Sequence, residues 1–324
     1  MSKSLNTFLC LFCIFFSLPN LLQAQESDGE TRRKAVLITG ASSGIGLRTT
    51  EVLAANGFHV YAGARKQADL DRLEAMEHVT AVRLDVTVQA EIDAAVAFVE
   101  AQGRGLHGLI NNAGVVLLAP LIEVSEEDLD FQMDVNVFGP YRVTKAFAPL
   151  LIESKGRIST TGSISGFATW GFGGPYTMSK HATEAFTDVL QAELRSFGVS
   201  VSIVEPGNFK SRITANMKER LEQQGYNTEG SRYKAALDGL FSGPMARAQY
   251  KEPDAVAEAF LHAMRDAEPK LRYMVVPNQQ EAALTIQSTL KRVVELNEEH
   301  EYSYSRDELV AMLDALLEQQ GSKD

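Results

Sequence analysis

The chain has few cysteines, an excess of negative charge and no long apolar run. Both cysteines, Cys10 and Cys13, lie near the start of the 324 residues. Their position excludes a disulfide framework, a cysteine-based zinc site and a cysteine nucleophile in the rest of the chain. The net charge of −11 argues against nucleic-acid binding, because an acidic surface repels phosphates. No group of histidines and carboxylates has metal-ligand spacing, so no metal site is predicted.

Residues 1–24 differ in composition from the rest. Their apolar run, Phe8 to Leu18, is shorter than the ~20 residues that a spanning helix needs and matches the core of a secretory signal. The alternatives are a membrane anchor through residues 5–22 and a helix packed in a cytoplasmic protein. We therefore expect the chain in the secretory pathway or periplasm, or anchored to a membrane, with a cytoplasmic location as the alternative. A polar linker, residues 25–33, follows.

Short β-branched runs alternate with helical stretches from residue 34 onward. This alternation predicts an α/β fold, a Rossmann-type doubly wound parallel sheet with helices on both faces. About seven runs read as strands, at residues 35–39, 59–63, 80–84, 108–111, 156–160, 200–204 and 271–276. We expect one catalytic domain over residues 34–278.

Two regions depart from this alternation. Residues 210–250 are polar and glycine-containing, and we expect an irregular insertion that acts as a substrate lid. Residues 279–324 form a helical extension, in which Ser305 and Glu308 have the spacing of a capping box. The extension is expected to pack on its own domain, with a partner-binding helix as the alternative. Its ten acidic and four basic residues argue against a membrane surface.

The segment Thr39–Gly46 lies between the first expected strand and the first helix. Gly40, Gly44 and Gly46 permit a tight turn and a close approach of the backbone to a pyrophosphate. The helix N-terminus supplies free N–H groups and a positive dipole. This context predicts nucleotide binding.

Arg65 and Lys66 follow the second expected strand, where an acidic residue would bind the ribose hydroxyls of NAD. A cation at this position favours a 2′-phosphate and therefore NADP(H) over NAD(H). The alternative is a solvated pair of cations at a loop tip.

Tyr176 and Lys180 are four residues apart in a helical stretch, which places them on one face. A nearby ammonium lowers the pKa of a tyrosine, so the pair can exchange a proton with an alcohol or carbonyl oxygen. Ser163 follows an expected strand, where its hydroxyl can hold the substrate oxygen.

These motifs together resemble the short-chain dehydrogenase/reductase family, in its compact single-domain branch, over residues 34–278. They occur in the family's order: Thr39–Gly46, residues 111–114 (Asn-Asn-Ala-Gly), Asn136, Ser163, residues 176–180 and Pro206-Gly207. Residues 252–273 resemble the hydroxysteroid and retinol dehydrogenases more loosely.

The resemblance implies roles residue by residue. Tyr176 is the general acid/base, Lys180 lowers its pKa and binds the nicotinamide ribose, and Ser163 orients the substrate oxygen. Asn136 holds a water that links Lys180 to solvent. The cofactor residues expected are Gly40, Ser42, Ser43, Gly44, Ile45, Gly46, Arg65, Asp85, Val86, Asn112, Ala113, Gly114, Tyr176, Lys180, Pro206, Gly207, Asn208 and Ser211.

We therefore expect an NAD(P)-dependent oxidoreductase that interconverts an alcohol and a ketone or aldehyde. Phe167, Trp170, Phe172 and Met178 favour a lipophilic, steroid- or retinoid-like substrate, unless they only pack the loop on the core. The alternative function is an inactive nucleotide-binding regulator, whose signature would be the loss of Ser163 or of the Tyr–Lys pair. The family resemblance also implies a homodimer or homotetramer.

Overall fold

The computed structural model describes residues 33–242 and 249–321. The expected signal or anchor, residues 1–24, lies outside the described residues and stays a prediction, as does nearly all of the linker. Within the described ranges, no helix has both the length and the apolar composition needed to cross a membrane.

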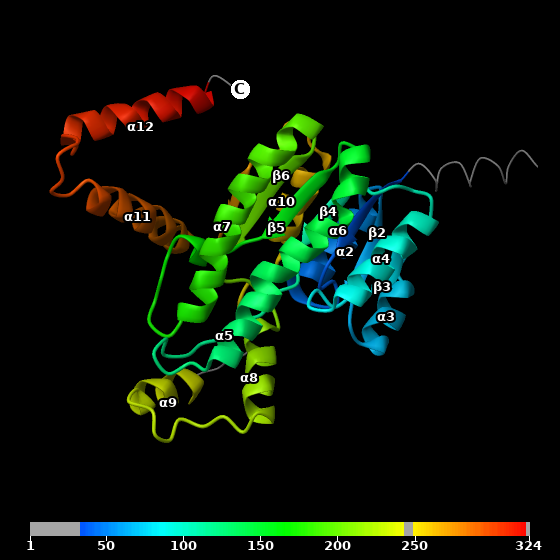
Figure 1. Cartoon of the computed structure of the whole chain (residues 1–324), viewed down its shortest axis with the longest axis horizontal. Coiled ribbons are helices and arrows are strands. Elements are labelled where there is room, and N and C mark those ends of the chain that lie inside the picture. Colours follow the sequence, from blue (N-terminus) through cyan, green and yellow to red (C-terminus); the bar gives the residue numbers. More distant parts are fainter. Residues whose placement is uncertain (1–32, 243–248, 322–324) are drawn as a thin grey trace, which may run out of the picture. The chain divides into compact units, whose positions relative to one another are not determined.

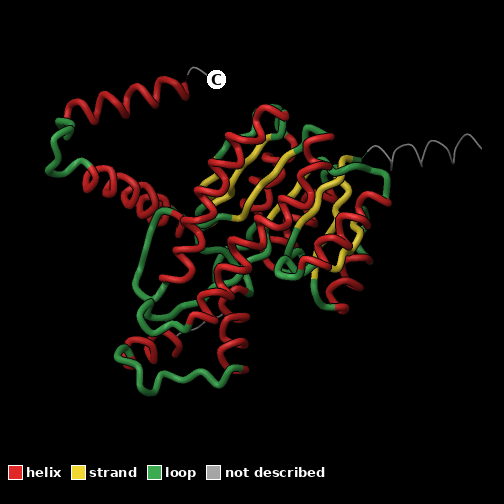
Figure 2. Tube along the Cα trace, viewed as in Figure 1, coloured by secondary structure: helices red, strands yellow, loops and turns green. Residues whose placement is uncertain are grey.

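Seven parallel strands form one sheet, in the order β3-β2-β1-β4-β5-β6-β7 (Figures 1 and 2). This confirms the predicted parallel sheet with a helical C-terminal region. The strands are β1 (Lys34–Ile38), β2 (Phe58–Ala64), β3 (Val79–Arg83), β4 (Gly108–Asn111), β5 (Arg157–Thr161), β6 (Ser200–Pro206) and β7 (Arg272–Val275).

Helices cover both faces of the sheet. The helices and short helical turns up to β6 are α2 (Gly44–Ala55), α3 (Gln67–Glu74), α4 (Gln89–Ala101), α5 (Glu126–Met133), η1 (Asp134–Phe138), α6 (Gly139–Glu153), η2 (Ile164–Gly166), α7 (Gly174–Leu194) and η3 (Arg195–Phe197). Those after β6 are α8 (Ile213–Gln223), α9 (Lys234–Ser242), α10 (Asp254–Arg265), α11 (Gln279–Leu296) and α12 (Arg306–Gly321).

Alternation along the strands divides the core into two layers. Val36 and Ile38 of β1 pack with α2, α3 and α10 on one face, and Leu37 packs with α4 and α6 on the other. Because successive strand residues point to opposite faces, a strand covered on both sides is apolar throughout. Because the strands are parallel, the carboxyl ends of the central strands meet at one edge of the sheet, between the two helical layers.

The region 210–250 is more regular than the sequence predicts, because its described residues include the helices α8 and α9. Met217 and Leu221 of α8 pack against Leu117 in a small separate core. Arg220 also donates a hydrogen bond to Asp128 of α5 at 2.8 Å. The segment is thus a helical cover attached to the domain, and its function as a lid stays a prediction.

The carboxyl-terminal extension departs from the expected packing. Thr285 of α11 is buried, but Val294 is 64% exposed and Leu316 of α12 is 60% exposed. Ser305 and Glu308 form the predicted capping box, with the Ser305 N–H donating to the Glu308 carboxylate at 2.8 Å. The first part of α11 packs on the domain, and in its second half Arg292 lies 2.7 Å from the ring of His181 in α7. The apolar stripe of α12 is exposed.

Candidate active site

The glycine-rich turn after β1 lies tightly against the turn after β4. Gly40 has a φ of +65°, and a Cβ added to it would lie 2.8 Å from the Ala113 Cα. The Asn112 amide donates to the Thr39 and Gly40 carbonyl oxygens at 3.0 and 3.1 Å. A Cβ on Gly46 would lie 2.3 Å from the Gly40 carbonyl oxygen. Gly40 and Gly46 are therefore required, because a Cβ at either position would clash with the neighbouring backbone. The turn leaves the first N–H groups of α2 available to a phosphate.

Tyr176 and Lys180 project from the first turns of α7 toward the end of β5. The Lys180 Nζ lies 5.7 Å from the centroid of the Tyr176 ring and donates to the Thr161 carbonyl oxygen at 2.7 Å. Burial lowers the pKa of Lys180 to about 8, against the opposing charge of Glu184. A lysine with this pKa is still mostly protonated at neutral pH, so it presents a positive charge to the tyrosine.

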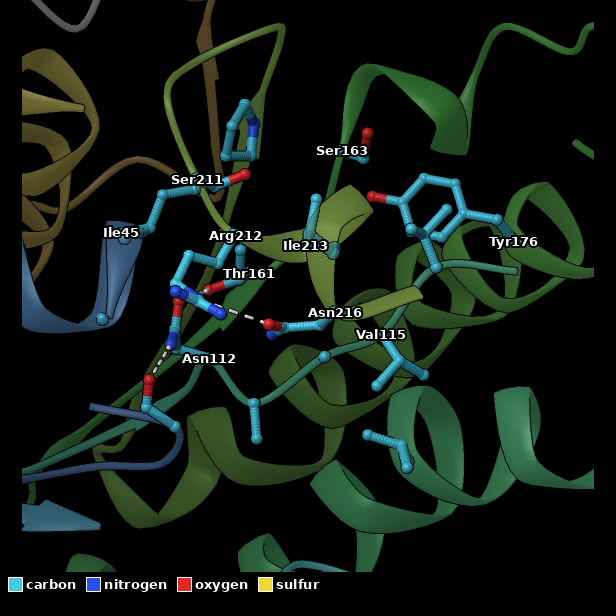
Figure 3. Close-up of a pocket in the computed structure, with 18 of the residues that line it drawn as sticks. Ile45, Asn112, Val115, Thr161, Ser163, Tyr176, Ser211, Arg212, Ile213 and Asn216 are labelled. Atoms are coloured by element: carbon cyan, nitrogen blue, oxygen red, sulfur yellow. Dashed lines mark hydrogen bonds between the residues drawn. The ribbon is translucent and has the colours of Figure 1, made fainter. Parts of the chain in front are cut away.

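Ser163 completes the arrangement from the other side. It follows β5, caps η2 and accepts a hydrogen bond from the Ser165 N–H at 3.1 Å. Figure 3 shows the Tyr176 hydroxyl directed toward Ser163. A carbonyl or hydroxyl oxygen between these two groups would be in reach of both, which is the geometry that proton exchange requires.

Asn136 lies in η1, a short π-helical turn, which often occurs at functional sites. Its amide donates to the Val115 carbonyl oxygen and to the Ser179 Oγ, both at 3.0 Å. Its side-chain oxygen accepts from the Val115 N–H at 2.8 Å. The side-chain amide of Asn136 thus links α7 to the turn after β4. A water at this position would have to bind to the remaining hydrogen-bond acceptors of Asn136.

Charged residues gather at the ends of β2 and β3. Asp85 accepts from the Thr87 N–H and hydroxyl at 3.0 and 2.7 Å, and Arg65 lies 3.4 Å away. Burial acts to raise the pKa of Asp85, but the Thr87 hydrogen bonds and the Arg65 charge outweigh it, so the pKa lies below its ordinary value. The Arg65 side chain is 64% exposed, which leaves it accessible to a phosphate.

A cavity of about 510 Å³ joins these groups. It runs from the Arg65 end to the Tyr176 end, and its size suits a nucleotide with a small substrate. Every cofactor residue expected from the sequence lines it, as does Ser163, whereas Asn136 does not. Together with the close-approach glycines, this lining fits a nicotinamide dinucleotide. Among the described residues, no group of three or more His, Cys, Asp and Glu could hold a metal.

The aromatic cluster expected around the substrate is largely elsewhere. Trp170 lines the cavity and its ring lies 6.3 Å from that of Tyr176, but Phe167, Phe172 and Met178 do not line it. Phe172 instead packs edge-on against Tyr233, with ring centroids 5.5 Å apart. The apolar wall is supplied by other segments, through Val116, Leu118, Ile164, Ala168, Phe209, Ile213 and Leu284.

Two residues at the site escape the sequence motifs. Arg72 of α3 donates to the Ser42 carbonyl oxygen at 2.6 Å, and Glu281 of α11 accepts from the Asn208 N–H at 2.8 Å. Both contacts join residues far apart in the chain, so no local spacing indicates them. The helix-start pattern of Asn278 and Glu281 indicates where α11 begins, but it does not indicate which residue the Glu281 carboxylate contacts.

Comparison with known proteins agrees with this geometry. Residues 34–222 match the family model for short chain dehydrogenases. The chain is 34% identical to an uncharacterized oxidoreductase, YbbO, of Escherichia coli over 76% of this chain and 87% of that protein. It is 32% identical to human 17-beta-hydroxysteroid dehydrogenase type 6 over 82% of this chain and 88% of that protein. A crystal structure of a short chain dehydrogenase/reductase from Burkholderia phymatum in complex with NAD, 27% identical, matches 85% of this chain and 99% of that one with a TM-score of 0.70. The chain is therefore a nicotinamide-dependent oxidoreductase that belongs to the short-chain dehydrogenase/reductase family.

Proposed function

We propose that the protein interconverts an alcohol and a ketone or aldehyde, with NADP(H) as the preferred cofactor and a lipophilic substrate. The observation that carries the reaction is the Tyr176–Lys180 pair facing Ser163 at the inner end of the nucleotide cavity. The cofactor would supply or accept the hydride. Tyr176 would move the proton, Lys180 would hold a positive charge beside it, and Ser163 would hold the substrate oxygen.

The test replaces Tyr176→Phe, which removes the hydroxyl and keeps the ring. We expect turnover to fall at least about 100-fold, the lower end of what general acid–base catalysis contributes. Binding of NADPH, followed by its fluorescence, should change little. Tyr233→Phe serves as the matched control, because Tyr233 packs against Phe172 and does not line the cavity. Undiminished turnover of Tyr176→Phe would refute its assignment as the acid/base.

The preference for NADP(H) is supported by Arg65, whose exposed guanidinium lies at the adenosine end of the cavity. Arg72 supports the glycine-rich turn after β1, because it donates a hydrogen bond to the Ser42 carbonyl oxygen. The similar Burkholderia protein is described with NAD, so the two cofactors must be titrated separately. Tighter binding of NADH than of NADPH would overturn the preference.

A lipophilic substrate is supported by the apolar wall of the cavity, which includes Leu118, Ile213 and Leu284. The similarity to a human hydroxysteroid dehydrogenase points in the same direction. A panel of sterols, retinoids and small ketones tests it, with kcat/KM as the measurement. A preference for small charged ketones would contradict the proposal.

A homodimer or homotetramer is supported by the outer face of α6 and α7. Tyr141 and Val189 are 48% and 56% exposed there, and with Ala148, Phe186 and Leu190 they line an apolar groove. A second copy of the chain would cover this groove. Light scattering on the purified protein measures the assembly, and a stable monomer would refute it.

A further inference from the structure

The start of α11 is built onto a segment of the cofactor cavity. Asn278 caps the helix by accepting from the Glu281 N–H at 2.9 Å, and its amide donates to the Glu281 Oε1 at 3.2 Å. These bonds hold the Glu281 carboxylate over the first turn of the helix. Its other oxygen is thereby directed away from α11 and toward the segment that follows β6.

That segment, Pro206–Asn208, lines the cavity, and the family resemblance places it beside the nicotinamide. The Glu281 Oε2 accepts from the Asn208 N–H at 2.8 Å, and a Cβ added to Gly207 would lie 2.1 Å from the same oxygen. The Gly207 N–H already donates to the Val275 carbonyl oxygen at 2.8 Å. The Glu281 carboxylate is therefore in close contact with the turn, and it accepts the hydrogen bond of the next backbone N–H, that of Asn208.

The first two turns of α11 also form part of the cavity wall. Leu284 lines the cavity, Thr285 is buried, and the helix contacts η2, which follows Ser163. Beyond this point α11 is largely exposed. The helix thus contacts both segments that flank the reacting atoms, and Glu281 is the residue that joins it to one of them by a charge-assisted hydrogen bond.

We infer that Glu281 is a positioning residue, which fixes the Pro206–Asn208 turn and so orders the nicotinamide end of the bound cofactor. This inference rests on the proposed function. Without the carboxylate, the Asn208 N–H loses its acceptor and the turn can shift away from the cavity. Leaving the Asn208 N–H without its charged acceptor destabilises the arrangement of the turn that binds the cofactor. The loss corresponds to about a tenfold weaker binding.

The experiment compares two ligands that share the adenosine end of the site. NADPH is titrated by fluorescence, and adenosine 2′,5′-bisphosphate, which has no nicotinamide, is titrated by calorimetry. We expect Glu281→Ala to weaken NADPH about tenfold and to leave the bisphosphate unchanged, since Arg65 and Asp85 lie at the other end of the cavity. If the wild type binds NADH more tightly than NADPH, NADH replaces NADPH and adenosine monophosphate replaces the bisphosphate in these titrations.

Two further variants distinguish positioning from a general loss of structure. Glu281→Gln keeps an oxygen that can accept from the Asn208 N–H, so its NADPH binding should stay within about twofold of the wild type. Glu295→Ala removes an exposed glutamate from the same helix, where its carboxylate lies 3.5 Å from the Lys291 Nζ, and this variant should bind both ligands normally.

Each remaining outcome is decisive. Equal weakening of NADPH and the bisphosphate by Glu281→Ala would show a structural effect and overturn the inference. So would Glu281→Ala binding NADPH as tightly as the wild type, or Glu281→Gln failing to restore binding. A wild-type chain that binds neither NADPH nor NADH would instead refute the proposed function itself.

Discussion

Glu205 of β6 and Glu184 of α7 lie together, and Arg272 of β7 faces both. The Arg272 Nε lies 3.1 Å from the Glu184 carboxylate and 3.5 Å from that of Glu205. Asp188 is a third carboxylate in the group, 2.7 Å from the same guanidinium. Burial, together with the neighbouring charge of Glu184, raises the pKa of Glu205 to about 8, with Arg272 opposing the shift.

The sign of the resulting stability change follows from this pKa. An unfolded glutamate titrates near 4.5, so folding favours the protonated form of Glu205. The stabilisation is complete below about pH 4.5 and is lost as the pH rises through about 8. At 1.36 kcal/mol per pKa unit, the whole interval is worth about 5 kcal/mol. Glutamine has the same shape and no charge at any pH, so it does not suffer this loss.

We therefore expect Glu205→Gln to be similar to the wild type at pH 5 and more stable by about 5 kcal/mol at pH 9. Urea unfolding at pH 5, 7 and 9 measures the difference. His107, whose pKa is lowered by burial, titrates in both proteins and cancels in the comparison. Glu184 does not cancel, because burial raises its pKa and it interacts with Glu205, so the measured difference belongs to the pair of carboxyl groups. Glu100→Gln, at an exposed position, is the matched control.

The reasoning fails if the difference between Glu205→Gln and the wild type is constant from pH 5 to pH 9. That result would mean that Glu205 is ionised throughout and that Arg272 fully compensates its burial. A variant less stable than the wild type at pH 9 would likewise show that the carboxylate, rather than the carboxylic acid, is the favoured form. Either outcome would reassign the group as a buried ion pair.

Three further predictions concern the cofactor end and the helical cover. Arg65→Ala should weaken NADPH about tenfold more than NADH, the cost of one charge-assisted hydrogen bond; equal weakening would remove Arg65 from cofactor selection. Gly46→Ala should weaken both cofactors at least about tenfold, since its Cβ would lie 2.4 Å from the Asn112 amide nitrogen; unchanged titrations would contradict the close contact. Gly239→Ala in α9, with no atom within 4 Å of the added Cβ, should raise the free energy of unfolding by about 0.5–1 kcal/mol, and a lower melting temperature would contradict it.

The strands and the helices around them were predictable because each depends on a local pattern. Continuous apolar runs such as residues 35–38 identify strands covered on both faces, and all seven predicted strands lie in the sheet. The region after β6 was predicted less well. Its polar composition indicates an irregular insertion, but α8 is helical and held by apolar contacts to Leu117. Such contacts between distant segments leave no trace in local periodicity.

The same distinction applies to the site. Tyr176 and Lys180 are neighbours on one helix, and the turn at Gly40 is local, so both could be placed from their spacing. Which side chains line the substrate cavity depends on how the loops pack. Phe172 has a positive φ of 64° and its ring packs against Tyr233, so an aromatic residue close to Tyr176 in sequence does not face the cavity.

The match to the family model ends at residue 222, whereas the cavity wall extends to Leu284. The turn at Gly40 and the Tyr176–Lys180 pair, which we propose to serve phosphate binding and proton transfer, lie inside the matched range. Leu284 and the Glu281 carboxylate lie beyond it, on a helix that also contacts η2 after Ser163. The residues that we propose for the chemistry of the reaction are therefore ones that the family motifs identify. Leu284 of α11 lines the same cavity as Tyr176, so resemblance within residues 34–222 alone leaves part of the cavity wall out of account.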